Sequence, residues 1–377
     1  MSLSLPTDPA SARSLTDVLT QSLASLDGTS DWFAPARSAV VFVVDGLGRG
    51  NLTARAGHAR FLVPRMTKRD SARSVFPATT ASALTSLLTG VAPGRHGIVG
   101  YRVRIPGTDA APNQLKGWET DGLDPRSWQR AEPIFAREAA RGRPCFVVSK
   151  AMYAQTGFTD AIMRGATFVA ADSIADRMER AVDLAARHAG ALVYTYAPEL
   201  DTTGHALGWE SDAWTHRLEQ VDDAARRLES ALPADVGAVL TADHGMVDVP
   251  RHRQILLGDD DPLLEDVHIV AGEPRMLHLY ANDGSAASVH DRWTQGEGER
   301  SWVLSRDEAV AAGLFGPVDA DVLPRIGDVL VAARSQIAYY DDRVGDKKAQ
   351  NMIGQHGSLT DAERIVPLIR LGAYAQK

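Results

Sequence analysis

Continuous apolar runs recur along the chain and predict buried β-strands. The first covers residues 38–44, Ser-Ala-Val-Val-Phe-Val-Val, and its β-branched residues leave no polar face. Runs of the same kind cover residues 144–149, 191–196 and 237–241. Between them, residues 172–188 and 211–232 have helical periodicity and are rich in Ala, Arg and Glu. Strands that alternate with helices predict an α/β fold with a mostly parallel central sheet and helices on both faces.

This alternation is interrupted between about residues 247 and 337. The segment contains the turn-forming sequences Gly258-Asp-Asp-Asp261 and Gln295-Gly-Glu-Gly298, and a short strand is expected at residues 276–280. We therefore expect a single catalytic α/β domain over residues 1–377, with an inserted cap or lid at about 247–337.

Composition and charge limit the functional classes to which this chain could belong. With 44% hydrophobic and 23% charged residues, the chain has the composition of an ordinary globular protein. Its net charge of -8 argues against a protein that coats nucleic acid polymers and fits a small phosphorylated substrate better. Cys145 is the only cysteine and lies in an apolar run, which indicates a buried core thiol. Neither a leader sequence nor an apolar stretch long enough to cross a membrane is evident, so we expect a cytoplasmic protein.

Acidic residues follow several predicted strands. Asp45 comes directly after the first strand, and Asp201 and Asp243 follow the strands at 191–196 and 237–241. Because ligands of such sheets bind outside the carboxyl ends of the strands, the three carboxylates are expected to meet at one edge. For Asp45 alone, capping of the next helix and metal ligation remain equal alternatives.

Histidines accompany these carboxylates. His205 lies four residues after Asp201, so one helical turn would place both side chains on the same face. His244 directly follows Asp243 after a buried strand, where a charged pair is costly to bury without a partner or a metal ion. His356 precedes Gly357, which would let the backbone approach closely, although a His-Gly pair alone is a weak signal.

The segment 76–85 offers a hydroxyl group. Thr79 and Thr80 stand at the start of a helix predicted to run to Leu88 and to end at Gly90, and capping of this helix is their ordinary interpretation. The alternative is a nucleophile beside a phosphate held at the helix N-terminus. A threonine hydroxyl needs a metal ion that lowers its pKa, and three Asp and three His with Thr80 suit two zinc-like ions.

In this order the motifs resemble those of the alkaline phosphatase superfamily, and within it the type I phosphodiesterase and nucleotide pyrophosphatase branch. The resemblance extends from Asp45 to His356. Its most specific parts are Asp45-Gly46, Phe76-Pro77 followed by Thr80, Leu88-Thr-Gly90 with Pro93 and His96-Gly-Ile98, Asp201-x-x-Gly204-His205, and Asp243-His244-Gly-Met246. The resemblance implies an alkaline-phosphatase-like three-layer sandwich with a small inserted cap.

The resemblance also implies roles for these residues. One metal ion would be held by Asp201, His205 and His356 and would activate the attacking water. The other would be held by Asp45, Asp243 and His244 and would bind Thr80. In-line attack by Thr80 on a phosphodiester or pyrophosphate would give a phosphothreonine intermediate, with a nucleotide as one candidate substrate.

Two positions depart from the family pattern. The family's frequent Asn three residues after the nucleophile is replaced by Ala83, and the Asn expected after His-Gly-Ile is missing around Tyr101. Loss of such a donor can cost on the order of 10²-fold in rate, so a substitute is expected, with Tyr101, Lys150 and the Thr80 amide as candidates. Phosphomonoesterase, phosphonate hydrolase and phosphoryl transferase therefore remain alternative activities, and a metal-stabilised binding protein is the alternative outside the enzymes.

Overall fold

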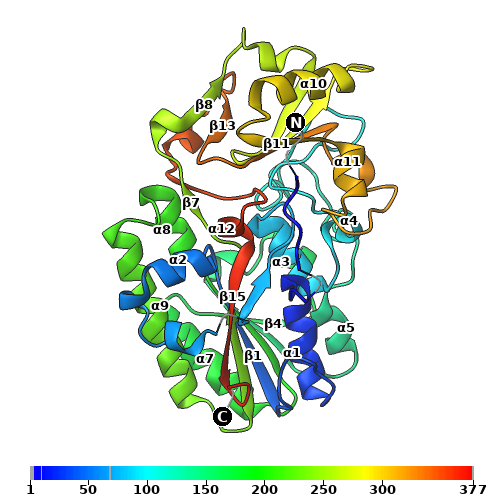
Figure 1. The fold of residues 1–377 in the computed structure, drawn as a ribbon. Coiled ribbons are helices and arrows are strands. Elements are labelled where there is room, and N and C mark those ends of the chain that lie inside the picture. The colour runs from blue at the N-terminus through cyan, green and yellow to red at the C-terminus, as the bar shows by residue number, and fades with distance from the viewer. Residues whose placement is uncertain (1–3, 10, 68, 376–377) are drawn as a thin grey trace.

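A seven-stranded sheet forms the centre of the structure, a computed structural model that describes residues 4–9, 11–67 and 69–375 (Figure 1). Expectations for the extreme ends, residues 1–3 and 376–377, lie outside the described residues. In spatial order the strands are β2 (Ser71–Arg73), β15 (Ile365–Gly372), β6 (Val236–Thr241), β1 (Ser38–Val44), β5 (Leu192–Ala197), β3 (Cys145–Ser149) and β4 (Thr167–Ala170). Only β15 runs antiparallel to its neighbours, so the mostly parallel sheet predicted from the sequence is confirmed.

The four apolar runs of the sequence form strands β1, β3, β5 and β6. Every residue of these strands is buried, as expected for parallel strands covered on both faces. The sequence pattern did not indicate β2 and β15. β2 is only three residues long, and β15 contains Pro367, which lies where β15 changes its partner from β2 to β6. A proline at such a change of partner disturbs the sheet less than one within a continuous ladder.

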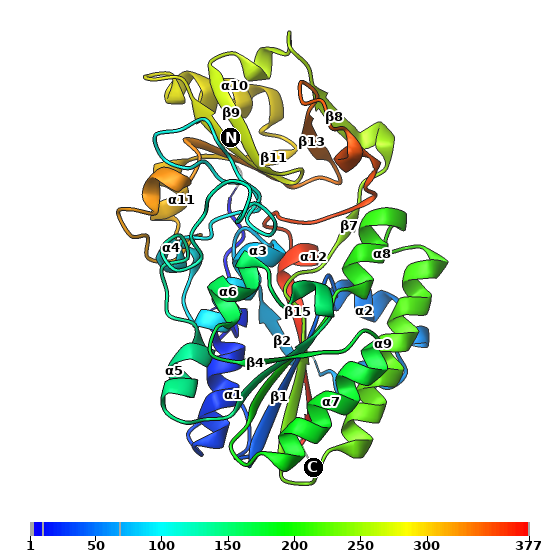
Figure 2. The same cartoon turned by 180° about the vertical axis from the view of Figure 1, so that it is seen from behind.

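Two helical layers cover the sheet (Figures 1 and 2). One layer contains α1 (Val18–Leu26), α3 (Thr80–Thr89), α5 (Ile134–Ala140) and α6 (Gly157–Met163). The other contains α2 (Arg49–Ala54), α7 (Ile174–Arg187), α8 (Glu199–Leu207) and α9 (Asp212–Ala231). The predicted helices at 172–188 and 211–232 correspond to α7 and α9, which begin after the capping residues Ser173 and Ser211.

A smaller antiparallel sheet lies at the carboxyl edge of the central sheet (Figure 1, top). Its strands are β11 (Ser301–Ser305), β12 (Val329–Ala333), β10 (Met276–Ala281) and β9 (Val267–Glu273), and it carries α10 (Ala286–Glu297) and α11 (Arg306–Ala311). Trp293, Leu279 and Val331 belong to a separate apolar cluster of this part. We call residues 254–341, from β8 (Gln254–Leu257) to β13 (Ala338–Asp341), the upper unit.

Two chain segments connect the upper unit to the central sheet. Below the parallel pair of β8 and β13, β7 (Val247–Asp248) pairs antiparallel with β14 (Gly354–Gln355). A second apolar cluster lies at the junction, where Phe76 contacts Phe315 with ring centroids 5.3 Å apart. The upper unit therefore packs directly on the segment that precedes Thr80.

The remaining elements are short. The helices α4 (Pro93–His96) and α12 (Asp361–Arg364) have one turn each, and the 3-10 helices are Leu15–Asp17, Ala56–His58, Val63–Arg65, Ala151–Tyr153, Arg251–Arg253, Pro262–Leu264, Leu323–Arg325 and Lys348–Asn351. None of the helices within the described residues has the length and apolar character needed to cross a membrane. The cytoplasmic location expected from the sequence stays a prediction.

Candidate metal centre and active site

Three aspartates meet at the carboxyl edge of the central sheet. Asp45 directly follows β1, Asp243 follows β6 by two residues, and Asp201 lies in the first turn of α8, just after β5. The pairing of β1 with β5 and β6 aligns the ends of these strands, with Val44 opposite Ala197 and Val43 opposite Thr241. The predicted convergence of the three carboxylates is present in the structure.

Gly46 allows this close approach. Its φ of +72° is in the left-handed region, and a Cβ atom at this position would lie 3.1 Å from the Cα and Cβ atoms of Asp201. The alternative of helix capping by Asp45 is wrong, because α2 begins only at Arg49 and its N-cap residue is Gly48. The Oδ2 atom of Asp45 instead accepts a hydrogen bond from the Tyr196 hydroxyl.

The histidines point one nitrogen into the site and anchor the other. The Nδ1 atoms of His205, His244 and His356 donate to the carbonyl oxygens of Gly354, Gly245 and Ala78 at 2.7, 3.1 and 3.0 Å. A carbonyl only accepts, so each Nδ1 carries a proton, and Nε2 is the nitrogen left to face the site. Metal-binding histidines are oriented by hydrogen bonds of this kind.

The Thr80 hydroxyl lies beside these rings. Its Oγ1 atom is 3.1 Å from the Nε2 atom of His244. The alternative of side-chain capping by the two threonines is not seen: Thr79 is the N-cap residue of α3 but makes no capping hydrogen bond, and Thr80 is the first helical residue. As predicted, α3 ends at Gly90, whose φ is +75°.

The carboxylate atoms that face the site lack partners among the described residues. These buried atoms are Asp45 Oδ1, Asp201 Oδ1 and Asp243 Oδ2. A buried carboxylate oxygen without a donor is costly, and a divalent cation would relieve that cost. The donor set of carboxylate oxygens and imidazole nitrogens therefore fits divalent metal ions.

The donor atoms form two groups that share His244. One group contains Asp45, Asp243 and His244, the other Asp201, His244 and His356, and within each group the donor atoms lie within 4.8 Å of one another. His205, which the family resemblance assigns to the second group, has its Nε2 atom 3.3 Å from Asp201 Oδ1. The rings of His244 and His356 are stacked at 3.6 Å, so His244 reaches both groups.

Burial dominates the electrostatics of these groups. It raises the pKa of Asp45 well above its usual value, and the negative charges of Asp201 and Asp243 add to the rise. Burial likewise lowers the pKa of His356 well below its usual value, and the neighbouring imidazoles of His244 and His205 add to the fall. Buried carboxylates that repel one another form an environment that attracts a cation.

Two residues near the centre were not singled out in the sequence. Tyr196 binds Asp45 from β5, and Glu273, at the end of β9, has Oε2 3.7 Å from His356 Nδ1. Gly357 makes room for Glu273, since a Cβ atom there would lie 2.5 Å from the Glu273 carboxyl carbon. Its backbone also pairs with Ala78, whose amide donates to the Gly357 carbonyl at 3.0 Å, so the expected close backbone approach is present. Tyr196 lies within a strand and Glu273 in the upper unit, so no local spacing signals their proximity to the site.

The two weak substrate candidates occupy different environments. Burial raises the pKa of Tyr101; a hydrogen bond with Asn113 opposes the rise, and the charges of Glu273 and Asp201 add to it. Lys150 follows β3 at the carboxyl edge, and its Nζ atom is 3.1 Å from Glu199 Oε1. The Lys150 side chain stays 30% exposed and is accessible to a ligand.

His96 and Cys145 have structural environments. The Nδ1 atom of His96 accepts from the Ile98 amide at 3.1 Å, and its Nε2 atom lies 2.8 Å from the Ser86 hydroxyl, so His96 organises the loop after α4. Cys145 is buried in β3, as expected from the sequence.

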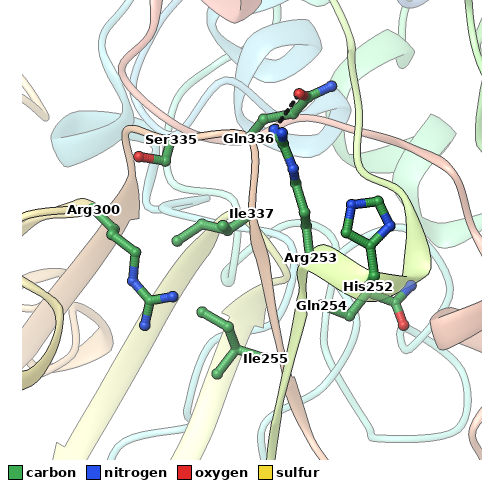
Figure 3. A pocket seen from close by; sticks show the side chains of 8 residues that line it. All are labelled: His252, Arg253, Gln254, Ile255, Arg300, Ser335, Gln336 and Ile337. Carbon is green, nitrogen blue, oxygen red and sulfur yellow. Dashed lines mark hydrogen bonds between the residues drawn. The ribbon is translucent and has the colours of Figure 1, made fainter.

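A separate cavity of about 350 Å³ lies between residues 252–255, at the start of β8, and residues 335–337, which join β12 to β13 (Figure 3). Its lining residues are His252, Arg253, Gln254, Ile255, Arg300, Ser335, Gln336 and Ile337. Figure 3 shows the two isoleucines between Arg300 and Arg253, whose guanidinium donates to Gln336 at 2.6 Å. None of the predicted site residues lines this cavity.

Solved structures of similar shape support the fold. Murine ectonucleotide pyrophosphatase / phosphodiesterase 5 superposes with a TM-score of 0.66 at 19% identity, covering 88% of this chain and 87% of that protein. An inactive threonine-to-alanine variant of the same protein in complex with AMP gives 0.68 at 18% identity, covering 89% and 88%. Phosphonoacetate hydrolase from Sinorhizobium meliloti in complex with phosphonoformate gives 0.67 at 18% identity, covering 90% and 91%.

Among curated proteins, an uncharacterized pyrophosphatase/phosphodiesterase of Schizosaccharomyces pombe is 27% identical over 234 residues, which cover 57% of this chain and 45% of the relative. The match thus spans less than half the length of that relative. The three layers define an α/β protein with the fold of these solved structures. The chain belongs to the type I phosphodiesterase / nucleotide pyrophosphatase family, whose model matches residues 39–359.

Proposed function

We propose that the protein is a metal-dependent hydrolase of phosphodiester or pyrophosphate bonds with Thr80 as its nucleophile. The observation that carries this proposal is the Thr80 hydroxyl, 3.1 Å from His244 Nε2 at the start of α3. Three buried carboxylate oxygens that have no hydrogen-bond partner in the described part of the chain surround the same point, and the chain belongs to a family named for this activity. A hydroxyl in such a place suits nucleophilic attack better than a structural role.

Two divalent ions are proposed as cofactors, with zinc favoured by the mixed imidazole and carboxylate donors. The proposed ligands are Asp45, Thr80, Asp243 and His244 for one ion and Asp201, His205 and His356 for the other. When bound, these ions would lower the pKa of the Thr80 hydroxyl and neutralise the phosphoryl oxygens.

Residues of the chain itself supply the attacking hydroxyl, orient the substrate and stabilise the charge of the phosphoryl group. Thr80 Oγ1 forms a bond to phosphorus while the bond to the leaving-group oxygen breaks on the opposite side. The amides and dipole at the N-terminus of α3 favour the negative charge of the phosphoryl group. Water then cleaves the phosphothreonine and restores the Thr80 hydroxyl. Tyr101 and Lys150 are the proposed substitutes for the family's missing Asn side chains.

The segment at about residues 247–337 is proposed to act as a cap. Its strands lie beyond the carboxyl edge of the central sheet, and Glu273 reaches His356 from this side (Figure 1). A cap in this place would limit the size of the leaving group and exclude water during the reaction.

A second candidate activity is hydrolysis of phosphonates or phosphomonoesters at the same centre. The similarity to phosphonoacetate hydrolase motivates it, together with the partly exposed ammonium group of Lys150 at the same edge of the sheet. That cation suits a substrate carboxylate. The AMP complex of the murine protein favours a nucleotide instead.

The test is a metal analysis combined with a substrate panel on wild type and Thr80→Ala. The panel contains bis-nitrophenyl phosphate, nitrophenyl phosphate, nitrophenyl thymidine monophosphate and phosphonoacetate. Two equivalents of zinc, preference for the diesters and loss of turnover in folded Thr80→Ala are expected. Preference for phosphonoacetate or the monoester would favour the second candidate, and full activity of metal-free protein would overturn both. A metal-stabilised binding protein instead predicts no turnover that depends on Thr80, together with unfolding of Asp243→Ala.

A further inference from the structure

The turn between β9 and β10 extends a buried arginine from the upper unit into the junction with the central sheet. Arg275 is 1% exposed, and its guanidinium forms two parallel hydrogen bonds of 2.8 Å with the Oε1 and Oε2 atoms of Glu363. The other N–H groups donate to the carbonyl oxygens of Ala333, Ser335 and Ile337 at 3.2, 2.9 and 2.9 Å. All five N–H groups of Arg275 therefore have acceptors.

The partner of Arg275 holds the two loops that carry candidate metal ligands. Glu363 Oε1 accepts from the Ser358 amide at 3.0 Å, two residues after His356. The backbone carbonyl of Glu363 accepts from the Gly245 amide at 2.8 Å, directly after His244. Glu363 thus connects the upper unit to the backbones beside both histidines, through its carboxylate on the His356 side and through its backbone carbonyl on the His244 side.

Stabilisation of the fold does not by itself account for a buried Arg275–Glu363 ion pair. Removing two charges from water costs about as much as their attraction returns, so apolar residues of similar volume are often equally stable. What the pair supplies beyond stability is geometry, because a bidentate guanidinium–carboxylate contact fixes distance and orientation together. Metal sites tolerate little displacement of their ligands.

We propose that Arg275 is a positioning residue for the candidate metal centre: through Glu363 it fixes the loops of His244 and His356. The upper unit then takes part in building the centre in addition to covering it. This inference rests on the proposed two-metal function. Arg275 does not touch the reacting atoms and acts only through the loops.

The chain offers a matched control for the test. Arg325 is also a buried arginine of the upper unit, 5% exposed, and its Nη1 atom donates to the carbonyl oxygens of Gly97 and Trp128 at 2.9 and 2.7 Å. Within the described residues, the side-chain hydrogen bonds of Arg325 reach neither ligand loop. Arg275→Lys and Arg325→Lys therefore make the same chemical change, with loss of the planar fork, at two buried sites of the same unit.

The experiment measures zinc affinity by competition with a chromophoric chelator and, separately, thermal unfolding of the metal-free proteins. Arg275→Lys is expected to bind zinc at least about 10-fold more weakly than wild type, the usual effect of losing a group that orients metal ligands. Arg325→Lys is expected to bind zinc as wild type does, even if its unfolding temperature falls as much.

A double variant separates positioning from folding. Arg275→Met/Glu363→Met leaves no unpaired buried charge, so it is expected to fold while still binding zinc more weakly. The positioning role alone would be overturned if Arg275→Lys or this double variant bound zinc as tightly as wild type. It would also be overturned if Arg325→Lys weakened zinc binding as much as Arg275→Lys. Absence of zinc binding by wild type would overturn the proposed function, and this inference with it.

Discussion

The Nε2 atom of His244 lies 3.1 Å from the Oγ1 atom of Thr80, although 164 positions separate the two residues in the chain. His244 Nε2 is also 3.4 Å from Asp45 Oδ1 and 3.7 Å from Asp243 Oδ2. The same ring nitrogen thus faces the proposed nucleophile and two of the proposed metal ligands. Every prediction about catalysis depends on this cluster.

Replacement of Thr80 by Ala is expected to lower kcat/KM on the best substrate by at least about 10³-fold, the scale of loss for an essential nucleophile. Folding should be retained because the Thr80 side chain does not cap α3. Metal content should be retained because Asp45, Asp243 and His244 remain as proposed ligands of the same ion. Steady-state kinetics with metal analysis and circular dichroism measure this.

Thr79→Ala is the control for this substitution. Thr79 precedes Thr80 and is also buried, but its hydroxyl lies beside Glu273, whereas the Thr80 hydroxyl lies beside His244. Loss of the Thr79 hydroxyl should change kcat/KM by less than about 10-fold. A Thr79→Ala variant that loses as much activity as Thr80→Ala would contradict the assignment of the nucleophile.

Tyr196→Phe is expected to weaken metal binding by about 10-fold, because the Tyr196 hydroxyl donates to Asp45 Oδ2 and so directs Oδ1 toward the centre. Tyr194→Phe is the matched control on the same strand. The Tyr194 hydroxyl is buried without a partner in the described structure, so its removal should leave metal affinity unchanged and stability equal or higher. Competition with a chelator measures both variants, and equal affinities in the two would argue against the role of Tyr196.

His96 gives a pH-dependent prediction. Burial, aided by the charge of Arg325, lowers the pKa of His96 from 6.5 to about 3 in the folded protein. Between these values the unfolded chain binds a proton that the folded protein does not, so the free energy of unfolding falls as pH falls from 6.5 toward 3. The stability advantage of wild type over His96→Gln should shrink by up to about 1.4 kcal/mol per pH unit in this window. Urea titrations at several pH values test this, and parallel curves would contradict it.

Cys145 is expected to resist thiol reagents in the native protein. Burial, together with the nearby charge of Glu138, raises the pKa of the Cys145 thiol to about 11. Since the thiolate is the reactive form, labelling by a disulfide reagent at pH 8 should be slow in buffer and fast in denaturant. Rapid stoichiometric labelling of folded protein would show that the thiol is accessible.

Local sequence patterns were sufficient to predict the central strands and the main helices. The run at 38–44 forms β1 with the predicted bounds, and Ser173 and Ser211 cap α7 and α9, because hydrophobic periodicity and capping depend on residues that are close in sequence. β15 was not predicted, because it pairs with β2 and β6, which are distant in the sequence, and changes partner at Pro367.

The sequence by itself determined which reactive groups the site could contain. These are the carboxylates at the ends of parallel strands, His205 one helical turn after Asp201, and a threonine at the start of a helix. Those features follow from strand polarity and helical pitch. Only the tertiary structure decided that His244 joins both donor groups, that Tyr196 holds Asp45, and that Arg275 binds Glu363. Such contacts join residues from separate elements, and packing of the whole chain, not local spacing, brings them together.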